Sequence, residues 1–156
     1  MAISPAGTTF AVGQDDGSAV LWSPGQRSGE RKRVGEPLPH MGVVTAVEYH
    51  PMNDRILATG CADGTVRVWE VQPESLVLNE LEFADMIYTL ALGPDDRTLA
   101  VAGNGGEVRL WNLESGKAVG KPLPHAGTVH ALAFSTDGRL LLTGGCEDGV
   151  AYLWNT

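Results

Sequence analysis

The sequence predicts an all-β fold, and its turn residues, its apolar runs and a regular spacing of landmarks support this. Glycine occurs 20 times among 156 residues, and 9 prolines add further turn-forming positions. Hydrophobic residues make up 43% of the chain and charged residues 19%, which suits a single folded domain over residues 1–156. Short runs rich in valine and leucine alternate with Asp-Gly and Gly-Gly turns, which is typical of many short strands.

Four tryptophans show that the sequence is repetitive. They are Trp22, Trp69, Trp111 and Trp154, separated by 47, 42 and 43 residues. A turn dipeptide lies six residues before each one, at Asp16-Gly17, Asp63-Gly64, Gly105-Gly106 and Asp148-Gly149. A repeat of about 40 to 45 residues is the period of β-propeller blades. We expect repeats at approximately 1–33, 34–76, 77–118 and 119–156.

Each repeat is predicted to form one four-stranded antiparallel sheet. The glycine of the turn dipeptide tolerates a positive φ, so the runs on either side are expected to form a hairpin. These runs are apolar on both faces, which requires cover on both sides, and a blade between two neighbours has it. For the second and third repeats we expect strands at 43–49, 56–60, 65–70, 76–81, 87–92, 98–102, 107–112 and 117–123.

The first and last repeats are predicted to be incomplete. The first offers strands at 8–12, 18–22 and within 33–38, and only residues 1–4 for its innermost strand. The fourth offers strands at 129–134, 140–143 and 150–154 and no outer strand. Turns at the opposite end of the sheets are expected at Asn53-Asp54, Asp95-Asp96 and Asp137-Gly138.

The repeated segments resemble one known family. The stretch from Leu57 to Trp69 is similar to strand b, turn and strand c of a WD40 repeat. The stretch from Gly35 to His40 recurs from Gly120 to His125, giving a "PLPH…DG…W" pattern of bacterial type. The resemblance implies a β-propeller of WD40 blades, and four copies that agree in spacing make it specific.

The resemblance also implies a hydrogen-bonded set in each blade, which ties the loop before the inner strand to the b–c turn. The matching residues are His40, Thr59, Asp63 and Trp69 in the second repeat, and His125, Thr143, Asp148 and Trp154 in the fourth. The fourth repeat carries one extra glycine, at Gly144 or Gly145, which shifts Thr143 in the alignment. A Thr, a His and an Asp could also form a hydrolase triad. Because the set recurs with the tryptophan, we interpret it as structural.

The first and third repeats depart from this pattern. Phe83 replaces the histidine and Gly105 replaces the aspartate in the third repeat, and Val12 and Val101 stand where Thr59 stands in the second. We therefore expect the third blade to depend on packing alone and to be the softest complete blade.

Partner binding is expected on the narrow face of the propeller, as the resemblance implies. The loops before the inner strands and the b–c turns form that face, and the matching residues are Met41, Val43, Ala62, Met86, Thr128 and Glu147. Methionines suit adaptable contacts. We expect a non-catalytic scaffold with a protein or peptide partner. The alternative is a segment of a larger signalling or regulatory protein whose catalytic domain lies elsewhere.

Charge and cysteine content argue against other classes of protein. A net charge of −8 disfavours nucleic-acid binding, and no cofactor site is recognised. The basic residues Arg27, Arg31, Lys32 and Arg33 are expected to form a solvated loop. Cys61 and Cys146 match no metal-ligand spacing, so we expect reduced thiols, no metal and a cytoplasmic location. No signal peptide or membrane-spanning run is expected.

The incomplete end blades favour self-association. Each open end would expose on the order of 400 Å² of apolar sheet, a patch that monomers rarely leave bare. Two copies meeting at both ends would bury about 1,600 Å², the size of a standard interface. We therefore expect a homodimer that closes an eight-bladed ring, or a fragment of a longer propeller.

Overall fold

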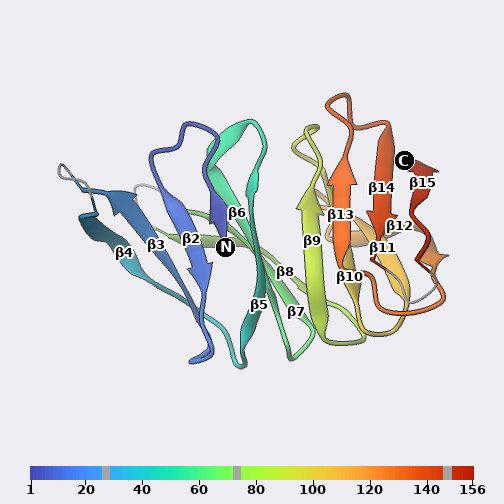
Figure 1. Cartoon of the computed structure of the whole chain (residues 1–156), viewed down its shortest axis with the longest axis horizontal. Helices are drawn as coiled ribbons and strands as arrows, with labels where there is room; N and C mark the ends of the chain where they lie inside the picture. Colours follow the sequence, from blue (N-terminus) through green and yellow to red (C-terminus); the bar gives the residue numbers. More distant parts are fainter. Residues whose placement is uncertain (26–28, 72–74, 146–148) are drawn as a thin grey trace.

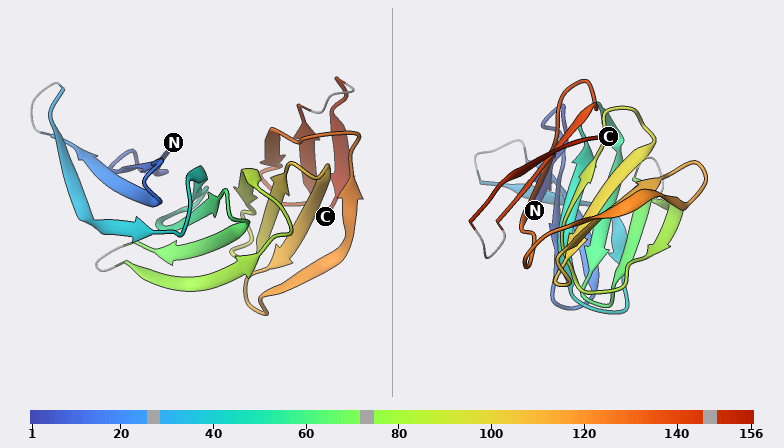
Figure 2. Two further views of the ribbon diagram at one scale, coloured as in Figure 1. Left: turned by 90° about the horizontal axis from the view of Figure 1, so that it is seen from below. Right: turned by 90° about the vertical axis from the view of Figure 1, so that its right-hand side faces the viewer.

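The computed structural model describes residues 1–25, 29–71, 75–145 and 149–156. These residues form four antiparallel sheets that follow one another along an open arc (Figures 1 and 2). Within each sheet the strands lie in chain order, each paired with the one before it. The predicted all-β propeller blades are therefore confirmed.

The described residues form fifteen strands, which make up the four blades. Blade 1 contains β1 (Ala2–Ile3), β2 (Phe10–Gly13), β3 (Ser18–Pro24) and β4 (Arg31–Pro39). Blade 2 contains β5 (Val44–His50), β6 (Asn53–Cys61), β7 (Thr65–Glu70) and β8 (Leu76–Glu82). Blade 3 contains β9 (Ile87–Leu92), β10 (Thr98–Gly103), β11 (Glu107–Asn112) and β12 (Lys117–Pro124). Blade 4 contains β13 (Ala131–Phe134), β14 (Leu140–Gly144) and β15 (Tyr152–Asn155).

Blade 1 has all four strands, but its inner strand is short, and the described residues of blade 4 provide no outer strand. The innermost strand of blade 1 has 2 residues. The described part of blade 4 forms a three-stranded sheet. The turn predicted at Asn53-Asp54 is wrong, because β6 begins at Asn53 and pairs it with His50, which leaves Pro51 and Met52 to make the turn.

The glycines of the predicted b–c turns adopt positive φ. The values are +84° at Gly17, +86° at Gly64, +70° at Gly106 and +70° at Gly149. Two of these turns also accept hydrogen bonds from the histidines that follow in the chain: His40 N donates to Gly17 O at 2.7 Å, and His125 N donates to Gly106 O at 2.7 Å. Each histidine therefore joins its own blade to the turn of the preceding one. Asp148, in the last turn dipeptide, lies outside the described residues.

The hydrophobic core consists of three layers, one between each pair of neighbouring blades. The first layer packs Leu21 and Leu38 against Leu57 and Trp69. The second packs blade 2 against Ile87, Leu90 and Leu99 of blade 3, and the third centres on Val108, Val129 and Leu141. Buried side chains on both faces of blades 2 and 3 explain why their strands are apolar throughout.

Candidate interaction surfaces and the networks behind them

The buried hydroxyl of Thr59 connects strand β6 to strand β7 and to the loop that contains His40. Thr59 Oγ1 lies 2.7 Å from His40 Nε2, and Trp69 Nε1 donates to Thr59 Oγ1 at 2.8 Å. Thr59 Oγ1 also lies 3.3 Å from Arg67 O, and we assign the hydroxyl proton to this carbonyl. Thr59 is completely buried, and Trp69 is 3% exposed. With this assignment, the Nε2 of His40 carries its own proton and donates to Thr59 Oγ1.

His40 is consequently a neutral side chain with one unused acceptor. Its Nδ1 is buried and has no hydrogen-bond partner among the described residues. Burial, with the nearby charge of Arg67 second, lowers the pKa of His40 to about 4. The aspartate expected to complete this set does not bond to the histidine. Asp63 Oδ1 instead accepts from the backbone N and the hydroxyl of Thr65, at 2.8 and 2.7 Å, and so fixes the b–c turn.

Blade 4 contains the same arrangement with a different proton position. His125 Nε2 lies 2.7 Å from Thr143 Oγ1, and Trp154 Nε1 donates to that oxygen at 2.9 Å. His125 Nδ1 lies 3.0 Å from Leu123 O, which can only accept. The neutral ring therefore carries its proton on Nδ1, and Thr143 donates to Nε2. Asp148, the remaining residue expected in this set, lies outside the described residues.

The extra glycine of the last repeat does not move Thr143 out of place. Thr143 pairs with Tyr152, two positions before Trp154, and Thr59 pairs with Arg67, two positions before Trp69. The additional residue is taken up beyond the strand, where Gly145 has a φ of +83°. Sequence alignment alone could not find this, because it counts residues and does not distinguish a strand from a turn.

Blade 3 has packing where blades 2 and 4 have hydrogen bonds. Val101, at the threonine position, is completely buried, and Phe83, at the histidine position, is 9% exposed. Both belong to the core layer between blades 2 and 3. The backbone bond to the preceding turn remains, since Phe83 N donates to Gly64 O at 2.8 Å.

The described loops that contain residues predicted for the narrow face lie along one edge of the arc, the lower edge of Figure 1. Met41 is 88% exposed, Val43 is 38% exposed and Met86 is 37% exposed. Ala62 and Thr128 are half-buried. Backbone bonds hold this edge: Ala62 N donates to Val43 O at 2.9 Å, and Asn104 N donates to Met86 O at 3.1 Å. Glu147 lies outside the described residues.

An aromatic pair on the inner strands was not predicted from the sequence as a unit. Tyr88 of β9 and His130, just before β13, form an edge-to-face contact with ring centroids 5.3 Å apart. Tyr88 is 39% exposed and His130 is also exposed. They follow Ile87 and Val129, which are buried, so the alternation of a strand turns these rings away from the core.

A carboxyl group in an apolar hollow was also missed. Glu48 of β5 lines a hollow of about 240 Å³ with Leu92, Leu132 and Phe134 among its walls. Burial raises the pKa of Glu48 to about 7. Nothing in the sequence pattern marks Glu48, because its neighbours come from two other blades.

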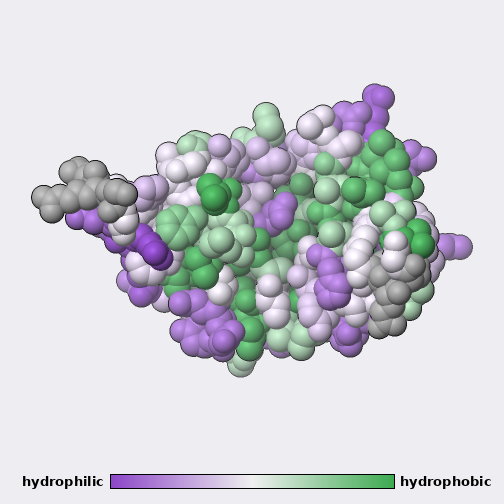
Figure 3. Space-filling model, viewed as in Figure 1, coloured by the Kyte–Doolittle hydropathy of each residue, from purple (hydrophilic) through white to green (hydrophobic). Residues whose placement is uncertain are grey.

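The outer faces of both end blades carry exposed apolar side chains. On blade 4, Leu142 is 47% exposed and Leu153 is 63% exposed, and the two are directly paired across β14 and β15. Figure 3 shows apolar residues gathered over this end of the arc. On blade 1, Ile3 is 68% exposed and is paired with Phe10.

Other predicted features are placed as follows. Arg31, Lys32 and Arg33 are exposed, but they lie in β4 and not in a loop, so that expectation is wrong for these three; Arg27 lies outside the described residues.

The Cys61 thiol is buried, which raises its pKa, and Cys146 lies outside the described residues. In the described ranges, no three His, Cys, Asp or Glu side chains cluster closely enough to hold a metal ion. No described helix is long and apolar enough to cross a bilayer.

Comparison with known proteins gives repeated matches to one family model. The model described as "WD domain, G-beta repeat" matches residues 32–70, 78–112 and 116–155. The yeast protein "2-deoxy-glucose resistant protein 2" is 35% identical over 83 residues, 51% of this chain and 9% of its own length. "Eukaryotic translation initiation factor 3 subunit I" of Aspergillus fumigatus is 35% identical over 86 residues, 55% of this chain and 23% of its own length. The bovine "Transducin beta-like protein 3" is 36% identical over 76 residues, with 48% and 9% covered. The chain therefore spans less than a quarter of these relatives.

Proposed function

Since the chain belongs to the WD40-repeat family, we propose that it is a non-catalytic scaffold whose narrow face binds a protein or peptide partner in the cytoplasm. The observation that carries this proposal is the exposure of Met41 and Met86 on one edge of a rigid frame. Loop residues on a rigid frame are the usual carriers of binding. An 88% exposed methionine presents a flexible apolar side chain that can adapt to a partner.

The threonine–histidine pairs support a structural role over catalysis. With the Thr59 proton assigned to the Arg67 carbonyl, His40 donates a hydrogen bond to Thr59, whereas a general base would accept one. Thr143 does donate to His125, but Thr143 is completely buried and its histidine is oriented by a backbone carbonyl in place of a carboxylate. Neither hydroxyl is open to a substrate.

The narrow face can be tested by partner capture from the source cell, quantified by mass spectrometry. The Met41→Ser and Met86→Ser double variant is expected to retain the fold and to lose the partners that the unmodified chain retains. A matched control is Met52→Ser, because Met52 is 79% exposed but lies in the turn between β5 and β6, at the other end of the blade. Equal loss with the control variant would contradict binding at the narrow face.

We further propose that two copies close an eight-bladed ring. The four blades form an arc, and the uncovered outer faces of blades 1 and 4 are apolar, with Ile3, Leu142 and Leu153 each about half exposed or more. A second copy related by a twofold axis would cover each of these apolar faces with an apolar face of its own. Leu142→Asp would place a charge in each new interface and is expected to give a folded monomer.

The other candidate is a WD40 segment within a larger signalling or regulatory protein. The observation that favours it is the length of the relatives, of which the matched regions are 9% to 23%. In that case further blades would cover the same two end faces. The full open reading frame and the mass of the endogenous protein distinguish the two candidates.

A further inference from the structure

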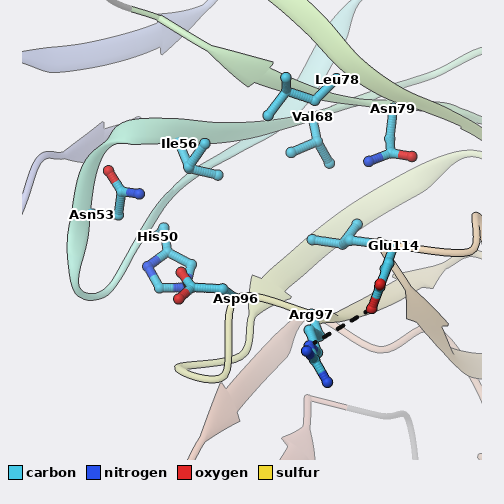
Figure 4. Close-up of a pocket in the computed structure, with 10 residues that line it drawn as sticks. His50, Asn53, Ile56, Val68, Leu78, Asn79, Asp96, Arg97 and Glu114 are labelled. Atoms are coloured by element: carbon cyan, nitrogen blue, oxygen red, sulfur yellow. Dashed lines mark ion pairs between the residues drawn. The ribbon is translucent and has the colours of Figure 1, made fainter.

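A hollow of about 450 Å³ lies between blades 2 and 3, away from the narrow face and from both end faces. Neighbouring blades touch at their inner strands and diverge outward, so space opens between β8 of one and the c–d turn of the next. Figure 4 shows side chains of both blades facing each other across this space. Its walls include His50, Ile56, Leu78, Asp96, Arg97 and Glu114.

One wall of the groove is apolar and within reach of solvent. Leu78 on the outer strand β8 is 47% exposed. Ile56 and Val68 continue the apolar surface toward the core, and Leu113 of blade 3 closes it. An aliphatic side chain of a partner could bury its surface against these residues.

The deep end of the groove contains a buried imidazole nitrogen that makes no hydrogen bond among the described residues. The His50 side chain is 2% exposed, and its Nδ1 accepts from Met52 N at 3.2 Å. A neutral His50 must therefore carry its proton on Nε2. Nε2 lies 3.1 Å from the carboxylate of Asp96, an ion-pair distance, but makes no hydrogen bond among the described residues. A buried N–H in this state favours a ligand that offers a carbonyl oxygen.

The opposite wall is rich in exposed carboxylates. The side chains of Asp96 and Glu114 are 73% and 74% exposed. Arg97 is the basic member of the lining, and its Nε lies 3.8 Å from Glu114 Oε2, a distance at which an exposed pair is weak. The lining therefore has an excess of negative charge, within a chain whose net charge is −8. Such a wall attracts a cationic group on a partner.

We propose that this groove binds an extended peptide segment in which an aliphatic side chain stands next to a lysine or arginine. The aliphatic side chain packs against Leu78 and Ile56, the cation lies by Asp96 and Glu114, and a peptide carbonyl accepts from His50 Nε2. This second surface goes beyond the proposed narrow-face binding. It lies inside a single chain and does not depend on dimer formation.

Fluorescence anisotropy with labelled hexapeptides tests the proposal on the full chain. The probes alternate leucine with lysine, leucine with glutamate, and serine with lysine. The leucine–lysine probe is expected to bind at least about tenfold tighter than the other two. It alone offers both an aliphatic side chain for the apolar wall and a cation for the acidic wall. The double variant Asp96→Asn and Glu114→Gln is expected to weaken that probe about fivefold and to reduce its salt dependence.

The controls separate this groove from other surfaces. Leu78→Ser is expected to weaken the leucine–lysine probe without changing the melting temperature by more than a few degrees, because Leu78 is half exposed. Glu36→Gln is the matched control, since Glu36 lines the corresponding hollow of about 410 Å³ between blades 1 and 2. Equal binding of all three probes, or an effect of Glu36→Gln as large as that of the double variant, would overturn the proposal. The proposal would also be overturned if Leu142→Asp lost binding of the leucine–lysine probe while Leu78→Ser kept it. That result would assign the probe to the outer face of blade 4.

Discussion

Replacing Thr59 with valine tests whether the buried hydroxyl network stabilises blade 2. Valine has nearly the shape of threonine, so the change removes one hydroxyl and leaves packing intact. The buried indole N–H of Trp69 and the imidazole N–H of His40 then lose their acceptor. A buried unsatisfied donor costs about 1–3 kcal/mol, so we expect the free energy of unfolding to fall by about 2–4 kcal/mol.

The same substitution at Thr143 provides the matched control. Its two bonds are of similar length, 2.7 and 2.9 Å, but His125 and Trp154 are only half-buried, so water can replace the lost hydroxyl. We expect a loss of about 1 kcal/mol there.

Urea unfolding followed by tryptophan fluorescence, at one fixed chain concentration, measures both losses. A double variant that gives blade 2 the apolar pair of blade 3, His40→Phe with Thr59→Val, is expected to lose less than the sum of the single variants. A loss below about 0.5 kcal/mol for Thr59→Val, or a larger loss for Thr143→Val, would refute this account of the network.

Three further predictions concern protonation. His40 has a folded-state pKa of about 4, below its ordinary value of 6.5, so it stabilises the fold above pH 6.5 and this contribution is lost as the pH falls toward 4. Urea unfolding between pH 4 and 6.5 measures this loss in the Glu48→Gln variant, because Glu48 itself titrates in that range. A free energy of unfolding that does not change with pH there would contradict the prediction. Glu48 has a folded-state pKa of about 7, above its ordinary value of 4.5, so its ionisation destabilises the fold as the pH rises from 4.5 through 7. Glu48→Gln is expected to be more stable than the unmodified chain by about 1–2 kcal/mol at pH 8 and equal to it at pH 4.5. No difference between the two proteins at pH 8 would contradict this. Imidazole ¹⁵N shifts at pH 7 are expected to show His40 protonated on Nε2 and His125 on Nδ1, and the same tautomer in both would contradict the assigned networks.

Much of the fold was predictable because its determinants are local. The spacing of Trp22, Trp69, Trp111 and Trp154 gave the number of blades, and the turn glycines gave the hairpins. The predicted inner and central strands of blades 2 and 3 match the observed strands closely. The start of β6 was misplaced because Asn53 is a common turn residue, whereas Pro51 and Met52 make the turn here.

The candidate sites were harder to predict because they depend on contacts between blades. Asp63 was expected to bond to His40, but its carboxylate is satisfied by Thr65, two residues away. The hollow beside Glu48 and the groove beside His50 combine side chains from blades that are far apart in sequence. A repeat pattern shows what blades have in common, whereas these sites come from what differs between them. The predicted narrow face rests on position within the repeat, and its role in binding stays a prediction.

The native mass of the purified chain tests the central claim most directly. Multi-angle light scattering during size exclusion measures this mass without assuming a shape. The account predicts twice the 16.5 kDa of one chain, because in the proposed ring a second copy would cover the apolar outer faces of blades 1 and 4. A folded particle of 16.5 kDa that stays monodisperse at high concentration would contradict the eight-bladed ring.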